Sequence, residues 1–175
     1  METILLRVAK ITSLTIHLPL DRISRLLQLL APSGPSVGEL HVVSEVLSMP
    51  SPGEQTAHEL WQNLPSLRQL FVSEYPIPLD QLNAQNLVHL ALDETGRRQS
   101  VALQSILNML RGCPRLETLF ISESCSDYKN PISDHSLVSL SHLRSIELTM
   151  FGVESDLVAH LQFPPNVAVG FRMLP

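Results

Sequence analysis

The amino-acid sequence predicts an α/β fold in which short parallel strands lie side by side and are joined by helical return segments. Three observations support this prediction. The pattern apolar-x-x-apolar-x-apolar recurs along the chain at intervals of 20 to 30 residues. Apolar residues between the copies follow helical spacing. The composition, 44% apolar and 17% charged in 175 residues, allows one domain with a substantial core. We therefore expect residues 1–175 to form a single domain.

The recurring motif marks the expected strands. Its copies begin at Ile11, Val37, Leu67, Leu87, Leu116, Leu143 and, in degenerate form, Pro164. Alternation in the second half of each motif directs the apolar side chains to one side of a strand and the intervening side chains to the other. This motif and its spacing are typical of leucine-rich repeats. We expect a right-handed strand–helix solenoid with a curved parallel sheet of about six to seven short strands.

The segments between the strands are expected to return as helices. Within residues 103–110, four apolar residues are spaced i, i+3, i+4 and i+7, which places them on one face of a helix. The same spacing recurs within residues 23–30 and 57–64, and in shortened form within 157–161. In the shortest unit, between Leu67 and Leu87, Pro76 and Pro78 leave room for little more than one helical turn near residues 79–82.

The charge distribution argues against several classes of partner. The chain has a net charge of −5, and its arginines are scattered rather than clustered. Binding to nucleic acid or to an anionic membrane normally requires a clustered basic surface, so we expect neither partner. Apolar runs stay below the roughly 18–20 residues that span a bilayer, and the N-terminus lacks the features of a secretory signal.

The two cysteines indicate a reducing compartment. An expected strand separates Cys113 from Cys125 and would place them about 20 Å apart, which is too far for a disulfide. We therefore expect an intracellular location, cytoplasmic or nuclear. Cys113 has no basic neighbour closer than Arg111 and Arg115, which favours a buried structural thiol over a reactive thiolate.

The stretch from Leu110 to Leu119, LRGCPRLETL, resembles the helix-end-to-strand junction of leucine-rich repeats in F-box proteins, where CP-x-L-x-x-L recurs. Residues 63–70 and 141–148 resemble it too. The irregular repeat length and the ending FPPNV are similar to the large, divergent F-box/leucine-rich-repeat families of mushroom-forming (basidiomycete-type) fungi. The resemblance implies the substrate-recognition arm of a cullin-type ubiquitin ligase, whose repeats bind the target protein.

Two departures from that family matter. The F-box helix bundle, typically opened by LP-x-E-(I/L)-(L/I), cannot be found, and Met1–Ala9 reads instead as the tail helix of a preceding repeat. The ligase-adaptor function of the family is therefore not carried over to this chain as it stands. Regular repeats also place an asparagine three residues beyond the strand motif. Here those positions hold Pro19, Glu45, Tyr75, Thr95, Ser124 and Phe151. We therefore expect the turns after the strands to satisfy their backbone groups individually, as in an irregular solenoid.

A partner protein is expected on the concave strand face, as in other repeat folds. The middle column of side chains on that face is Thr15, His41, Phe71, Ala91, Phe120, Glu147 and Ala168. Strand spacing puts Phe71 and Phe120 about 10 Å apart with small Ala91 between them. An exposed aromatic pair ringed by polar groups is typical of a binding hot spot. The alternative is that Phe71 and Phe120 are merely tolerated at the surface or are covered by the loops after the strands. The predicted binding residues are His41, Phe71, Ala91, Phe120 and Glu147, with Gln69, His89 and Asp93 from the neighbouring columns.

Two other hypotheses compete with a protein-binding scaffold. A small hydrolase or metal-dependent enzyme could use His17, His41 and His89 with Glu39 and Asp93, but no two of these histidines share the close spacing of metal ligands on one element. We therefore expect no catalytic residue, no metal, no cofactor and no small-molecule substrate. The third hypothesis is a truncated repeat fragment without independent activity, because the first repeat lacks a polar cap.

Overall fold

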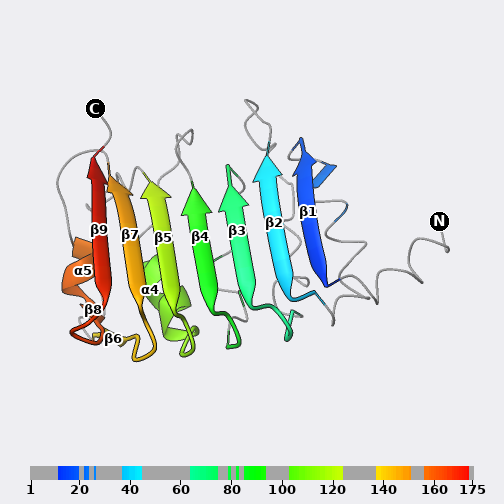
Figure 1. Ribbon diagram of the computed structural model, residues 1–175. Coiled ribbons are helices and arrows are strands. Elements are labelled where there is room, and N and C mark those ends of the chain that lie inside the picture. Colours follow the sequence, from blue (N-terminus) through cyan, green and yellow to red (C-terminus); the bar gives the residue numbers. More distant parts are fainter. Residues whose placement is uncertain are drawn as a thin grey trace.

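Seven strands form one parallel sheet in which neighbours in space are also neighbours along the chain (Figure 1). The computed structural model describes residues 12–19, 22–23, 26, 37–44, 64–74, 79, 82, 85–93, 103–123, 137–150 and 156–173. The strands of the sheet are β1 (Ser13–Leu18), β2 (Glu39–Ser44), β3 (Gln69–Ser73), β4 (His89–Asp93), β5 (Thr118–Glu123), β7 (Ser145–Met150) and β9 (Ala168–Met173). The predicted α/β class and parallel sheet are confirmed.

The register of the first six strands follows the predicted columns. Leu40, Leu70, Leu90, Leu119 and Ile146 are aligned across neighbouring strands, and Val42, Val72, Leu92, Ile121 and Leu148 form the next aligned row. All ten side chains are buried, whereas the side chains between them along each strand are mostly half-buried. This alternation arises because one face of the sheet packs on the core and the other does not.

The turns that lead into the strands repeat one hydrogen-bonding scheme. In the CP-x-L stretch, the N–H of Leu116 donates to the carbonyl of Cys113 (3.2 Å), and Leu67 and Leu143 make the equivalent bond to Leu64 and Leu140. Proline suits the second position of such a turn. Both apolar ends of each turn are buried, at 0–2% exposure. The stretch that resembles the F-box repeats is therefore a tight turn anchored in the core at both ends.

Successive turns are also joined by their backbones. The N–H groups of Glu117 and Thr118 both donate to the carbonyl of Val88, and those of Arg144 and Ser145 both donate to Glu117. The same pairing of two donors with one carbonyl occurs before β2, β3 and β4. Backbone N–H groups at the start of β2, β3, β4, β5 and β7 are thus satisfied by a carbonyl at the start of the preceding strand of the sheet.

The helix expected within residues 103–110 is present as α4 (Leu103–Arg111), and its four predicted apolar positions are buried. It ends at Gly112, where an added Cβ would lie 3.1 Å from the carbonyl oxygen of Met109. The return within residues 157–161 contains the four-residue α5 (Asp156–Ala159). Near residues 79–82, one turn is closed by the N–H of Leu82 on Leu79. Among the described residues, no helix is long and apolar enough to cross a membrane.

The return expected within residues 57–64 lies outside the described residues apart from buried Leu64, and so does most of the return within 23–30. Of the positions where regular repeats carry asparagine, only Pro19 is described, and its carbonyl accepts the N–H groups of Arg22 and Ile23. A small second sheet, β6 (Val138–Ser139) with β8 (Leu161–Gln162), was not predicted. Its strands have only two residues each, too short for a periodic signal.

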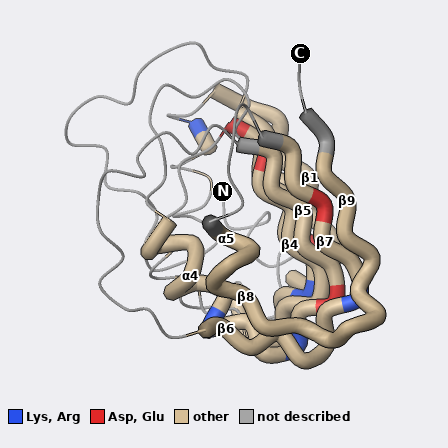
Figure 2. The backbone as a smooth tube through the Cα atoms, turned by 90° about the vertical axis from the view of Figure 1, so that its left-hand side faces the viewer, with Lys and Arg blue, Asp and Glu red and all other residues tan. Residues whose placement is uncertain are grey.

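The sheet and the helices form two layers. Viewed along the sheet, the seven strands lie on one side and α4, α5, β6 and β8 on the other (Figure 2). The core lies between them, where buried α4 residues such as Ile106 and Leu107 pack in one cluster with the buried strand residues. The face of the sheet that points away from α4 is called the open face below.

The last strand departs from the predicted register. The motif beginning at Pro164 placed Val167 opposite Ile146, but Val169 lies there and β9 is shifted by two residues. The reason is that Pro164 begins a turn, closed by the N–H of Val167 on Pro164, instead of occupying the first apolar position. Ala168 and Gly170 therefore move along the open face, so that Gly170 and not Ala168 lies opposite Glu147.

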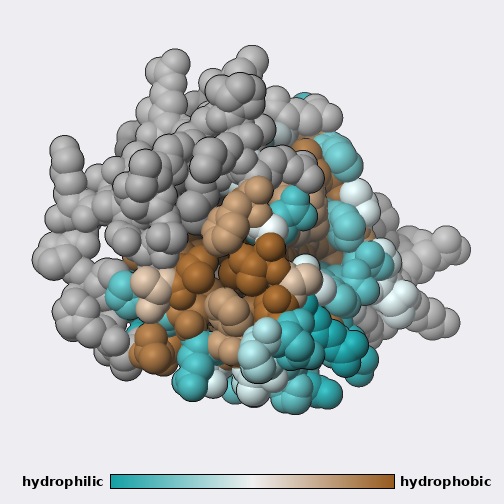
Figure 3. All heavy atoms as spheres, turned by 60° about the vertical axis from the view of Figure 1, so that its left-hand side comes forward, coloured by the Kyte–Doolittle hydropathy of each residue, from teal (hydrophilic) through white to brown (hydrophobic). Residues whose placement is uncertain are grey.

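The shifted strand leaves an apolar end to the sheet. Val169 and Phe171 point to the same side as the core residues Ile146 and Leu148, yet they are 42% and 60% exposed. Hydrophobic surface gathers at this end of the molecule (Figure 3).

Asn86 connects three successive turns at the edge of the sheet where the strands begin. Its Nδ2 donates to the carbonyl of Pro65 (2.8 Å), and its Oδ1 accepts from Nη1 of Arg115 (3.3 Å). Replacing Asn86 with alanine is expected to lower the free energy of unfolding by about 0.5–1.5 kcal/mol, because both bonds are lost at an exposed site. Chemical denaturation measures the change.

The matched control is Arg115→Ala, which removes only the donor to Oδ1 of Asn86 and keeps the bond from Nδ2 to Pro65. Its free energy of unfolding should fall between those of the wild type and Asn86→Ala. An Asn86→Ala variant as stable as the wild type would show that the backbone bonds alone hold the turns.

Candidate functional site

A shallow groove of about 300 Å³ lies across the middle strands of the open face. Seven of the eight residues predicted to bind a partner line it: His41, Gln69, Phe71, His89, Ala91, Phe120 and Glu147. Thr118 and Ser145 also line it. The sequence placed these two residues in the neighbouring column, but neither was expected to contribute because small hydroxyl side chains give no distinctive signal.

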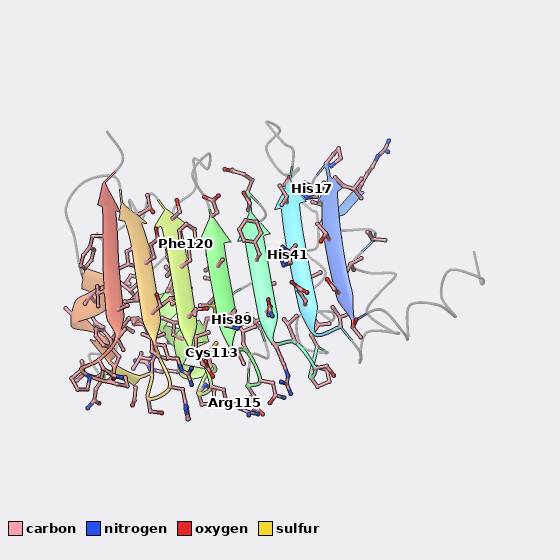
Figure 4. All side chains as sticks on the ribbon, in the orientation of Figure 1. His17, His41, His89, Cys113, Arg115 and Phe120 are labelled. Atoms are coloured by element: carbon pink, nitrogen blue, oxygen red, sulfur yellow. The ribbon has the colours of Figure 1, made fainter. Side chains whose placement is uncertain are left out.

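Five residues of the middle column predicted from the sequence form the middle row of the groove, which crosses five strands. His41, Phe71, Ala91, Phe120 and Glu147 are successive partners in the register from β2 to β7. Neighbouring strands lie about 4.8 Å apart, so the Cα atoms of Phe71 and Phe120 are separated by about 10 Å. Because Ala91 is the smallest residue of this row, the row has a notch between the two phenylalanines. Figure 4 shows His41 and Phe120 on their strands near the two ends of this row.

His41 lines one end of the groove and contacts Glu39, which lies outside it. Its Nε2 lies 3.1 Å from Oε1 of Glu39, two residues earlier on the same face of β2. The His41 ring also lies against Phe71, with ring centroids 5.6 Å apart and an interplanar angle of 31°. These two contacts fix the imidazole, and through it they limit the positions that the Phe71 ring can take.

The neighbouring row of the groove, which lies closer to the turns that lead into the strands, is polar. Nδ1 of His89 and Oγ1 of Thr118 are joined by a hydrogen bond of 2.6 Å between β4 and β5. Gln69 lies beside His89 in the register. An apolar notch bordered by groups that can donate and accept hydrogen bonds suits a protein ligand, which presents both kinds of surface.

Asp93 is the one predicted site residue that does not line the groove. It lies at the C-terminal end of β4, where its register partners are Ser73 and Ser122. Strand alternation predicted an open column of His17, Val43, Ser73, Asp93, Ser122, Thr149 and Gly170. Ser122 and Thr149 of this column are only 4% exposed, so the prediction is wrong there. Oδ1 of Asp93 is itself buried and has no hydrogen-bond partner among the described residues. The third column is therefore closed over β5 and β7, whereas Val43, Ser73 and Asp93 of the same column are half-buried.

The histidines of the open face do not converge. His17, His41 and His89 lie on β1, β2 and β4 and belong to three different columns (Figure 4). Within the described part of the chain, no group of three or more His, Cys, Asp or Glu side chains is arranged to hold a metal ion. Nothing in this geometry singles out a general base or a nucleophile in the groove.

Cys113 lies in the core, as expected for a structural thiol. It is 0% exposed, and its Sγ donates to the carbonyl of Met109 at 3.3 Å. Burial away from water raises the pKa of this thiol to about 12, because the thiolate would lose its hydration. Cys113 is therefore protonated at neutral pH. The second cysteine, Cys125, lies outside the described residues.

No protein-family model, no curated protein and no solved structure matches this chain.

Proposed function

We propose that this chain is a leucine-rich-repeat solenoid whose open face binds another protein. The repeat architecture is supported by the sequential parallel strands and by the turn scheme that recurs before them. The aligned rows of buried leucine, isoleucine and valine support it as well, since stacking buries apolar faces that a single unit would expose.

The observation that carries the binding proposal is the row Phe71, Ala91 and Phe120 on the open face. Phenylalanine side chains normally lie in the core, and these two are half-buried in the row that faces away from it. Two large aromatic residues on either side of a small one offer a site for an anchoring side chain of the partner. Little conformational entropy is lost on binding there, because the strands already hold the two rings. We therefore place the centre of the interface at Ala91.

The proposal is tested by replacing both rings, Phe71→Ala together with Phe120→Ala. The binding partner is first captured by a photo-crosslinking amino acid placed at exposed Gln69 on the border of the groove, with the same amino acid at exposed Leu137 as the control position. We expect the double variant to bind the captured protein at least about tenfold more weakly, because hot-spot side chains each contribute more than 1 kcal/mol. Calorimetry with the purified partner measures the dissociation constant.

Phe171→Ala is the matched control, since Phe171 is an exposed phenylalanine outside the groove. It should leave the dissociation constant unchanged. The melting temperature of the double variant should stay within a few degrees of the wild type. Equal affinities for wild type and double variant would exclude the groove, and a large loss of melting temperature would show that both rings belong to the core.

The resemblance to F-box proteins supports a finer proposal, in which the bound protein is a target for ubiquitination. The CP-x-L-x-x-L stretch that carries the resemblance forms the junction between α4 and β5. The test is whether the captured partner accumulates when the gene for this chain is deleted and whether its ubiquitin conjugates disappear. If the level and the ubiquitin conjugates of the partner stay unchanged, the chain binds the partner without a role in ubiquitination.

A further inference from the structure

The outer edge of β9 is open. β9 is the last strand of the sheet and, among the described strands, it has a neighbour on one side only. The N–H of Ala168 donates toward β7, to the carbonyl of Arg144. Because alternate residues of a strand bond to opposite sides in a parallel ladder, the backbone groups of Val169 and Phe171 point away from β7. An open edge of this kind is a template for another strand.

Two apolar side chains lie beside this open edge. Val169 and Phe171 continue two buried rows of the core, but they are 42% and 60% exposed. At the opposite edge of the sheet, Ile16 of β1 occupies one of the same rows and is only 3% exposed. Two of the three exposed large apolar side chains among the described residues are thus on β9, at the end where Figure 3 shows hydrophobic surface.

The β9 end of the molecule also has few charges. Residues 157–171, which include most of α5, β8 and most of β9, contain no Asp, Glu, Lys or Arg, and this is the longest such stretch in the chain. The whole chain has a net charge of −5, so two copies repel one another on average. The uncharged end is where a second copy can approach with the least repulsion.

We propose that two copies of this chain associate through β9, in an interface separate from the groove. A two-fold axis perpendicular to the sheet brings the same edge of both copies together, and the two β9 strands then run antiparallel. With the axis at Gly170, Val169 of each copy lies opposite Phe171 of the other, and such aromatic–β-branched pairs stabilise sheets. Arg172 lies opposite Ala168, so the two arginines are at opposite ends of the strand pair.

The size of this end predicts a weak dimer. The six-residue β9 is about 20 Å long, and the sheet with the layer behind it is about 20 Å deep. Two copies therefore bury on the order of 800 Å², which is below the roughly 1,200–2,000 Å² of stable complexes and typical of transient ones. The open faces of both copies lie on the same side of the extended sheet.

Analytical ultracentrifugation of the complete chain over a range of concentrations tests the proposal. The wild type should form a dimer at concentrations up to about 0.5 mM. Phe171→Glu should stay monomeric, because the interface would bury two carboxylates without partners. Gln85→Glu is the matched control, since it adds the same charge at an exposed turn before β4, and it should form the dimer as the wild type does.

A cysteine on the proposed axis tests the antiparallel pairing. The two Gly170 Cα atoms would lie about 4.5 Å apart in a non-hydrogen-bonded pair, which is close enough for a disulfide. A side chain fits at this position, because an added Cβ would come no closer than 3.7 Å to Cγ of Glu147. Under mild oxidation, Gly170→Cys should link two copies through the peptide that contains residue 170, as detected by mass spectrometry, whereas Gln85→Cys should not.

A wild type that stays monomeric at about 0.5 mM, or a dimer that Phe171→Glu leaves intact, would overturn the proposal. A dimer without the disulfide between the two copies of Gly170→Cys would contradict the pairing of the β9 strands. If Gly170→Cys becomes linked in cells to a different protein and not to its own copy, the edge has another occupant and the dimer is wrong.

Discussion

Replacing Leu90 with alanine is expected to lower the free energy of unfolding by about 2–5 kcal/mol. Leu90 is 2% exposed at the centre of β4, and its register partners Leu70 and Leu119 are equally buried. The substitution removes apolar contacts and leaves a cavity between Leu70 and Leu119, which cannot collapse because the ladder fixes the strand spacing. Natural domains are stable by only about 5–15 kcal/mol, so the loss is a large fraction of the total.

Urea denaturation followed by circular dichroism measures this change, and Leu137→Ala provides the matched control. Leu137 is 56% exposed, so the same truncation there should change the free energy of unfolding by less than about 0.5 kcal/mol. A Leu90→Ala variant that lost no more stability than Leu137→Ala would show that Leu90 is not in a packed core. Such a result would also contradict the two-layer arrangement.

The second large effect concerns the chemical reactivity of Cys113. At pH 8, alkylation of Cys113 by iodoacetamide in the folded chain should be at least about a thousandfold slower than in the unfolded chain. The pKa of this thiol is raised from its ordinary 9.0 to about 12 by burial, which reduces the reactive thiolate by that factor, and 0% exposure blocks the reagent as well. Mass spectrometry of the peptide that contains Cys113 gives the rate.

The reference is the rate for the same peptide in denaturant. Folded-state labelling within about tenfold of that rate would show that Cys113 reaches solvent and that the junction between α4 and β5 is not anchored as described.

The same thiol affects stability at high pH. Because its pKa is higher in the folded chain than in the unfolded chain, its stabilising contribution is complete below pH 9 and is lost as the pH rises toward 12. The wild type should therefore lose about 1.4 kcal/mol per pH unit more than Cys113→Ala within this range. Parallel slopes for the two chains would contradict the raised pKa.

The sheet was predictable because its signal repeats. Each strand has two inward apolar residues, and a shift by one residue would expose both of them, so the alternation alone specifies the register. At Leu70, Leu90, Leu119 and Ile146 the motif and the ladder agree. Helix α4 was predictable for the same reason, since its buried residues recur at helical spacing.

The β9 register was not predictable from the motif. Val167 satisfies the apolar pattern equally well as a strand residue or as the last residue of a turn. The consecutive prolines Pro164 and Pro165 favour the turn, which the structure contains. The two-stranded β6–β8 sheet was missed because its formation depends on residues 23 positions apart, such as Val138 and Leu161, and not on a local pattern.

The sequence by itself determined the class of this fold, the order of the strands and the row that holds Phe71, Ala91 and Phe120, because alternation along a strand is a local property. Only the tertiary structure decided that Asp93 is excluded from the groove and that Thr118 is bonded to His89. The physical reason is that burial and side-chain hydrogen bonds depend on which groups of distant segments meet, and a one-dimensional pattern does not contain those distances.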